Sequence, residues 1–125
     1  MLAYKPVVNF KDKRGVIIDL LEKRNINAIT YISFTKGAVR ANHVHKKTIQ
    51  HNYVISGKVK IVTQFGNKKK NSKILTKGDL ATTIANEKHA LLGLSKAEIM
   101  VFTEGPRGGK EYEKDTFRLA VPLIK

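Results

Sequence analysis

The sequence contains no cysteine, which excludes disulfide bonds, thiolate metal ligands and a cysteine nucleophile. Any metal ion would have to be held by histidine, carboxylate or amide groups. No apolar run approaches the roughly 20 residues that a membrane helix needs. The opening stretch "MLAYKPVVNF" lacks the basic region and apolar core of a secretory signal. We therefore expect no membrane span and a cytoplasmic location.

Arginine is scarce for so basic a chain. The formal charge is +14, yet only five of the 24 basic residues are arginine, and the lysines are spread along the sequence with one local run at 67–73. Surfaces that bind nucleic acid favour arginine and interleaved aromatic residues, a pattern that does not occur here. We therefore expect no specific nucleic-acid partner. A lysine-rich surface remains compatible with a small anionic substrate.

No stretch of a dozen residues has convincing helical periodicity. Short runs of alternating apolar residues are separated by regular turn signals, most clearly at 27–34 and 58–65. The tail 116–124 is read as a last strand. The glycine-rich stretch before it could cover a substrate, but we expect a surface hairpin loop. A chain of 125 residues is long enough for its own core, so we expect a single all-β domain over 1–125, a sandwich or barrel.

Three of the four histidines fall within nine residues of the stretch "RANHVHKKTIQHNYVISG" (40–57). In a strand, residues i and i+2 point to the same face, so His43 and His45 share one face. Alternation on the next strand places Gln50 on one face and His51 on the other. If the two strands are neighbours, Gln50 lies beside the histidine pair, and His51 points away from it toward a surface or interface.

The fourth histidine, His89, opens a later strand after two turns. Together with His43, His45 and the amide of Gln50 it forms a plausible ligand set for a divalent metal such as Zn, Mn, Fe or Ni. Neutral imidazole is the ligating form, and unperturbed histidine is mostly neutral near pH 7. Histidine is also suited to proton transfer, so the same residues could act as acid and base.

The spacing of these residues resembles the first signature of the cupin superfamily, whose five positions fall on Gly37, His43, His45, Gln50 and Gly57. Metal-binding cupins usually carry Glu where this chain has Gln50. The second signature is matched in residue type only at Gly78 and His89. The resemblance implies a small single-domain cupin, which is a double-stranded β-helix or jelly-roll barrel, with these side chains in its interior. Small cupins are commonly homodimers, so a homodimer is expected.

A narrower resemblance links "VRANHVHKKTIQ" (39–50) to the "RGxHAHKxxxQ" stretch of dTDP-sugar 3,4-ketoisomerases. The matching residues are Arg40, His43, His45, Lys46 and Gln50, whereas Ala41 and Val44 depart from the family pattern. "KDKRG" (11–15) is similar to the "DxRG" opening of these isomerases and of the related 3,5-epimerases. The resemblance implies a nucleotide-sugar isomerase or epimerase of surface-polysaccharide biosynthesis that needs no cofactor.

The site roles follow from that resemblance and from the chemistry of ketone migration, which passes through an enediol(ate) and needs a base and an acid. His43 and His45 would supply them, and Arg40 would face a developing oxyanion or a diphosphate. Arg40, Lys46 and Gln50 would bind the anionic nucleotide sugar. The alternative is a metal-binding cupin, dioxygenase-like or a non-catalytic small-molecule binding module, with a divalent metal on His43, His45, Gln50 and His89.

Overall fold

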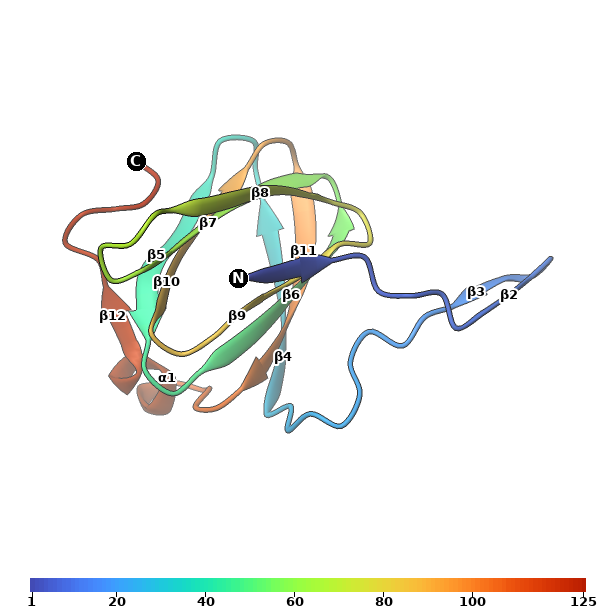
Figure 1. The fold of residues 1–125 in the computed structure, drawn as a ribbon, viewed down its shortest axis with the longest axis horizontal. Coiled ribbons are helices and arrows are strands. Elements are labelled where there is room, and N and C mark those ends of the chain that lie inside the picture. The colour runs from blue at the N-terminus through green and yellow to red at the C-terminus, as the bar shows by residue number, and fades with distance from the viewer.

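Two five-stranded antiparallel sheets enclose a common interior in the computed structural model, which describes residues 1–125 (Figure 1). The first sheet contains, in spatial order, β1 (Leu2–Tyr4), β9 (Leu80–Thr83), β6 (Ile49–Ser56), β11 (Ala97–Glu104) and β4 (Ala28–Phe34). The second contains β12 (Thr116–Arg118), β5 (Val39–His45), β10 (Glu87–Gly93), β7 (Lys58–Phe65) and β8 (Asn71–Thr76). The expected all-β jelly-roll fold of the cupins is therefore confirmed.

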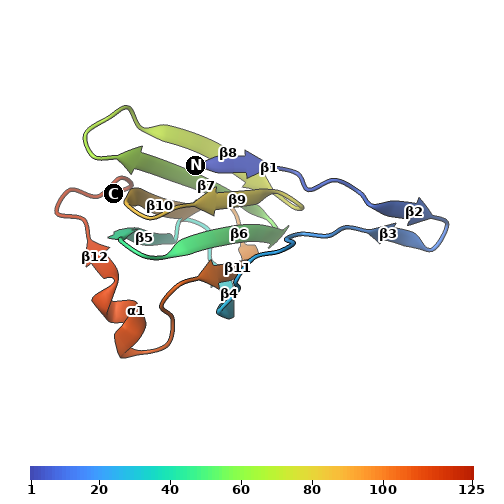
Figure 2. The same cartoon turned by 60° about the horizontal axis from the view of Figure 1, so that its bottom comes forward.

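A small hairpin of β2 (Phe10–Asp12) and β3 (Gly15–Ile17) projects from this body (Figure 2). The chain turns between these two strands at Lys13 and Arg14. Asp12 closes the turn, since it accepts hydrogen bonds from the backbone N–H and the guanidinium of Arg14 at 2.7–2.9 Å. Phe10 and Ile17 remain more than half exposed on the hairpin.

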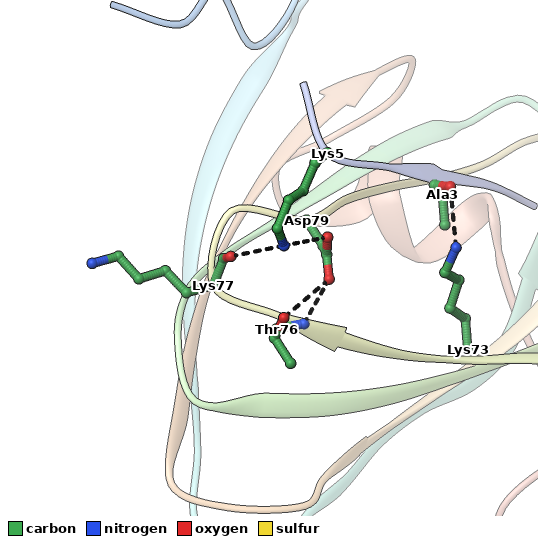
Figure 3. Close-up of polar contacts among 6 residues, drawn as sticks. All are labelled: Ala3, Lys5, Lys73, Thr76, Lys77 and Asp79. Carbon is green, nitrogen blue, oxygen red and sulfur yellow. Dashed lines mark hydrogen bonds and ion pairs between the residues drawn. The ribbon is translucent and has the colours of Figure 1, made fainter. Parts of the chain in front are cut away.

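The first strand is held to the barrel by polar contacts at its end (Figure 3). Lys5 Nζ donates to Asp79 Oδ1 at 2.8 Å and to the Lys77 carbonyl at 3.2 Å, so β1 is attached to the turn between β8 and β9. The other oxygen of Asp79 accepts the backbone N–H of Thr76 at 2.8 Å and closes that turn. The chain that leads to the projecting hairpin is therefore anchored to the barrel at Lys5.

The interior is apolar at one end and polar at the other. The apolar end holds the core, which includes Phe34, Leu75 and Leu91. Toward the other end, the inward residues change type on several strands, reading Val59, Ile61, Thr63 on β7; Ile99, Val101, Thr103 on β11; and Val54, Asn52, Gln50 on β6. Burial of the apolar half drives folding, and the polar half is left for a site.

The chain closes the polar end with a short helix, α1 (Lys110–Lys114), followed by β12. The expected last strand over 116–124 is wrong beyond Arg118, because the chain then turns around Asn42. The side-chain oxygen of Asn42 accepts the backbone N–H groups of Leu123 and Ile124 at 2.8 and 3.2 Å. These contacts replace a sheet ladder. None of the helices has the length and apolar character needed to cross a membrane.

Candidate active site

Three imidazoles converge at the polar end of the barrel. His43 on β5 is the cross-strand partner of His89 on β10, and His45 follows two residues later on the same face as His43. The ring centroids of His43 lie 4.6 Å from those of both His45 and His89. One ring nitrogen from each histidine lies within 4.8 Å of the others. The predicted grouping of these three residues is therefore present in the fold.

A bulge in β5 sets the orientation of this group. Ala41 and Asn42 both have positive φ, at 68° and 56°, and the register with β10 shifts between His43 and Ala41. A bulge adds one residue to a strand. As a result Arg40, three residues before His43, is the cross-strand partner of the core residue Leu91, although its side chain is exposed.

Backbone carbonyls select the tautomers of two histidines. His45 Nδ1 lies 2.9 Å from the Asp115 carbonyl, and His89 Nδ1 lies 3.3 Å from the Glu87 carbonyl. A carbonyl only accepts hydrogen bonds, so each Nδ1 carries the proton and each Nε2 carries a lone pair. The Nε2 atom of His45 is buried and has no hydrogen-bond partner. It is therefore free to accept a proton or bind a metal.

All three imidazoles are held neutral. Burial lowers the pKa of His43 to about 3, and the nearby His89, His45, Arg118 and Arg107 act in the same direction. Burial also lowers the pKa of His89 to about 4. The pKa of His45 falls for the same reason, although its hydrogen bond to Asp115 and the Gln50 side chain oppose the shift. Neutral imidazole at pH 7 is the form required of a base or a metal ligand.

Other polar groups at this end of the barrel also lack partners. The hydroxyls of Thr63 and Thr103 are buried with no hydrogen bond, and Thr103 is the cross-strand partner of Gln50. Leaving buried polar groups unpaired costs free energy, which favours a polar ligand or water at this place. We did not single out these threonines from the sequence. The sequence signal that could have identified them is a polar residue at the end of a run in which every second residue is apolar and points inward.

Asp115 fixes the turn that follows the two β5 histidines. Its Oδ1 accepts the backbone N–H groups of Lys46 and Lys47 at 3.1 and 3.0 Å, and its Oδ2 accepts the Thr48 hydroxyl. Burial opposes ionisation of this carboxyl, but the hydrogen bonds from Thr48, Lys47 and Lys46 lower its pKa overall. Since its carbonyl also binds His45, this one residue positions both the turn and the imidazole.

The segment 105–115 covers the site, so the expected surface hairpin is wrong. The ring of Tyr112 on α1 lies 5.3 Å from the ring of His45, and the guanidinium of Arg107 lies 4.1 Å above the ring of Tyr112. Three glycines with positive φ, Gly105, Gly108 and Gly109, allow the chain to bend over the barrel end. From the sequence, this stretch could have covered a substrate, but we expected a surface loop that only connects two strands.

Arg40 and Lys46 are engaged elsewhere in this structure. Arg40 donates its Nε and Nη2 to the Ser33 carbonyl at 3.2 and 2.9 Å, with its guanidinium 5.4 Å from the centre of the Phe34 ring. Lys46 is exposed, and its ammonium lies 4.6 Å from the centre of the Phe117 ring. The arginines whose charge reaches His43 are Arg118 and Arg107, which the sequence analysis did not select.

His51 points away from the other histidines, as alternation predicts. It is nevertheless buried, with 3% of its surface exposed, so a solvent-exposed position is wrong. Its Nδ1 contacts the Thr82 hydroxyl at 2.8 Å and its Nε2 contacts Glu104 at 2.6 Å. Arg24 binds the same carboxylate oxygen at 2.7 Å. These contacts satisfy both ring nitrogens and give His51 a structural role.

The donor set also suits a divalent transition metal. Three neutral imidazoles can ligate through their free nitrogens, while the carbonyls of Asp115 and Glu87 orient two of the rings from behind. Gln50 lies near His45 and could add an amide oxygen. Ligating nitrogens of a tetrahedral site lie about 3.3 Å apart, so the imidazoles, which lie within 4.8 Å, would move closer together on binding.

The fold closely resembles solved structures of sugar-nucleotide enzymes. A 3,4-ketoisomerase from Helicobacter canadensis superposes with a TM-score of 0.76 and 23% identity, covering 90% of this chain and 92% of that one. A histidine-to-asparagine variant of the 3,4-ketoisomerase QdtA from Thermoanaerobacterium thermosaccharolyticum, in complex with TDP-4-keto-6-deoxyglucose, gives 0.77 and 19%, covering 94% and 86%. A dTDP-4-dehydrorhamnose 3,5-epimerase from Sulfolobus tokodaii gives 0.76 and 17%, covering 91% and 73%.

No family model matches the sequence, and no curated protein does either. The expected likeness to 3,4-ketoisomerases and 3,5-epimerases is confirmed at the level of the cupin fold, over most of the chain.

Proposed function

We propose that this chain is a nucleotide-sugar isomerase or epimerase that acts on a dTDP-4-keto-6-deoxyhexose-like substrate in surface-polysaccharide biosynthesis. The observation that carries the proposal is the buried Nε2 of His45, which has no partner and shares the barrel interior with two other neutral imidazoles. The likeness to enzymes of this kind supports it.

His45 Nε2 is the base in this proposal. It takes the proton from the carbon beside the ketone, and the electron pair moves toward the carbonyl oxygen to form an enediol(ate). The carbonyl of Asp115 holds the protonated Nδ1, so the ring is oriented and the imidazolium that forms is stabilised. In ketone migration a proton is then delivered to the former carbonyl carbon, and the neighbouring hydroxyl loses its proton.

His43, as a neutral imidazole, would donate a ring N–H to the ketone oxygen and so polarise it, and the Tyr112 hydroxyl is the proton donor on the cover segment. His43 shares the inward face of β5 with His45. Arg107 on the cover segment places positive charge near His43, which would stabilise the enediolate oxygen. Arg40 joins Arg107 if it exchanges the Ser33 carbonyl for substrate. No cofactor is required by these steps.

Substrate binding would use Gln50 and Lys46 in addition to Arg40. Gln50 is buried beside His45 and would bind a sugar hydroxyl. Lys46 stands at the turn after His45 and would attract the diphosphate. Since Tyr112 covers His45, segment 105–115 would open to admit the sugar and then close over it, which excludes water from the enediolate.

A turnover assay tests this proposal. Wild-type protein is incubated with dTDP-4-keto-6-deoxyglucose, and the product is followed by proton NMR. His43→Asn and His45→Asn are expected to lower turnover by about a hundred- to ten-thousand-fold. His51→Asn is the matched control, because His51 lies on the other face of the sheet, and it should turn over at nearly the wild-type rate. Thermal unfolding checks that each variant folds.

Two outcomes would overturn the proposal. The first is wild-type protein that neither converts nor binds any dTDP-linked keto sugar. The second is a His45→Asn variant that folds and turns over like the wild type.

The second candidate is a metal-binding cupin, favoured by the close approach of three neutral imidazole nitrogens. Elemental analysis of purified protein would then find nearly one divalent metal per chain, lost in His43→Ala and His89→Ala. A chelator discriminates between the two functions: activity of the first kind survives EDTA, whereas a metal-dependent activity does not.

We further propose that the protein is a cytoplasmic homodimer. The projecting β2–β3 hairpin exposes Phe10, Val16 and Ile17, each more than half accessible, and a second copy would cover them. Equilibrium sedimentation should give twice the chain mass of 14.0 kDa. Phe10→Ser together with Ile17→Ser should shift the protein to the monomer, while a monomeric wild type would contradict the proposal.

A further inference from the structure

A cavity on the outside of the barrel is lined by cations. It has a volume of about 480 Å³ and lies between the β7–β8 loop and the C-terminal tail 119–123. Its polar lining consists of Lys70, Lys88, Arg118, Gln64 and Asn67, and none of the histidines takes part. We call it the cationic cavity.

The sheet register separates this cavity from the candidate active site. Thr63 and His89 are cross-strand partners that point into the barrel. Their neighbours Gln64 and Lys88 are also partners, and alternation turns them to the opposite face of the same sheet. The cationic cavity and the histidine site therefore use adjacent residues on opposite sides of β7 and β10.

No acidic side chain lines the cavity. Residues 23–78, which supply β5, β7 and β8, contain neither aspartate nor glutamate. Within the strands of this sheet the only acidic residue is Glu87, which is 1% exposed and already paired with the N-terminal ammonium. Three cations around one cavity repel one another, and a bound anion would remove that cost.

The walls of the cavity are fixed in advance. Lys88 Nζ donates to the Gly66 carbonyl and Gln64 Nε2 donates to the Lys68 carbonyl, both at 2.8 Å, so they hold the β7–β8 loop in place. The ammonium of Lys88 retains further N–H groups for a ligand. Asn42 fixes the opposite wall, since it accepts the Leu119 N–H on its carbonyl and the Leu123 N–H on its side chain. Such preorganisation lowers the entropic cost of binding.

From these features we propose that the cationic cavity binds a phosphate-bearing ligand, separately from the substrate of the histidine site. A guanidinium matches phosphate oxygens with paired N–H groups, lysine adds charge, and the two amides add neutral donors. The apolar tail residues 119–123 leave room for an organic group attached to the phosphate. The proposal does not depend on the isomerase activity.

The test uses inorganic pyrophosphate as the probe, titrated into ¹⁵N-labelled full-length protein at constant ionic strength. Backbone shifts are expected in 64–70, at Lys88 and in 118–123. Lys70→Gln with Lys88→Gln should weaken binding about tenfold or more, because each removes a charge-assisted contact. Lys36→Gln with Lys96→Gln is the matched control, because it removes the same charge from exposed turns and should leave binding unchanged.

Further arms identify the source of the phosphate and the site. His45→Asn should bind pyrophosphate like the wild type. Cosedimentation with phosphatidylglycerol vesicles that needs Lys70 and Lys88, without pyrophosphate binding, would assign the phosphate to a lipid headgroup. Three results would overturn the proposal: no binding of either probe, equal weakening in the control variant, or shifts centred on His43, His45 and His89.

Discussion

Acid should destabilise this protein through its buried histidines. Burial holds the pKa of His43 at about 3 and that of His89 at about 4, whereas both lie near 6.5 in the unfolded chain. Below pH 6.5 the unfolded state therefore binds protons that the folded state does not, and stability falls with falling pH. The stability is fully present above about pH 6.5 and is lost as the pH approaches the folded values.

The size of the effect follows from the two pKa values. For each histidine that the fold keeps neutral, the free energy of unfolding falls by up to about 1.4 kcal/mol for each pH unit below pH 6.5. Unfolded histidine is already half protonated at pH 6.5, so between pH 6.5 and pH 4.5 the pair together lowers the free energy of unfolding by about 4–5 kcal/mol. That loss is comparable with the total stability of a small domain, about 5–15 kcal/mol. The lowered pKa of His45 acts in the same direction.

Urea unfolding followed by circular dichroism measures this effect, at half-unit pH steps and with EDTA present. His43→Asn replaces a titrating group with a neutral one and should lower the pH slope by about one proton. Carboxylates such as Asp79 and Asp115 also have lowered pKa values, so the difference between variant and wild type isolates the histidine. Equal slopes in the two proteins between pH 6.5 and 4.5 would refute the buried, neutral state of His43.

Three further predictions address the cover, its anchor and a glycine. Tyr112→Phe should lower kcat by about a hundredfold with unchanged thermal stability; an unchanged kcat would leave the ring only a covering role. Thr48→Val removes a buried hydrogen bond to Asp115 and should lower the free energy of unfolding by about 1–3 kcal/mol, and a neutral result in urea would contradict that anchor. Gly57→Ala should lower the free energy of unfolding by about 2–3 kcal/mol, because φ is 78° and a Cβ there would lie 2.2 Å from the Lys96 carbonyl oxygen. Gly66→Ala is the control: φ is 54° but no atom lies near the added Cβ, so the loss of unfolding free energy should be smaller.

Strand alternation was sufficient to predict much of the barrel and of the site. The run 58–65 is β7 over its whole length, and 27–34 is β4 to within one residue. The shared face of His43 and His45, and the inward direction of Gln50, required only the two-residue period of a strand. These features are local, so neighbouring residues carry the information.

Contacts between distant segments lay beyond that pattern. The carbonyl that orients His45 belongs to Asp115, 70 residues later, and a backbone acceptor leaves no residue-type signal. The bulge at Ala41 and Asn42 depends on positive φ at two residues that are not glycine. The cover segment was read as a connector because its five-residue helix is too short for a periodic signal.

Deuterium exchange tests proton transfer by His45 most directly, because it detects removal of the proton even where little product forms. The protein is incubated with dTDP-4-keto-6-deoxyglucose in deuterated water, and deuterium on the sugar ring is located by NMR. Wild-type protein is expected to introduce deuterium beside the ketone, or at the former ketone carbon after migration. His45→Asn should not, while His51→Asn should. Exchange at the wild-type rate in folded His45→Asn, or no exchange in the wild type, would contradict the account.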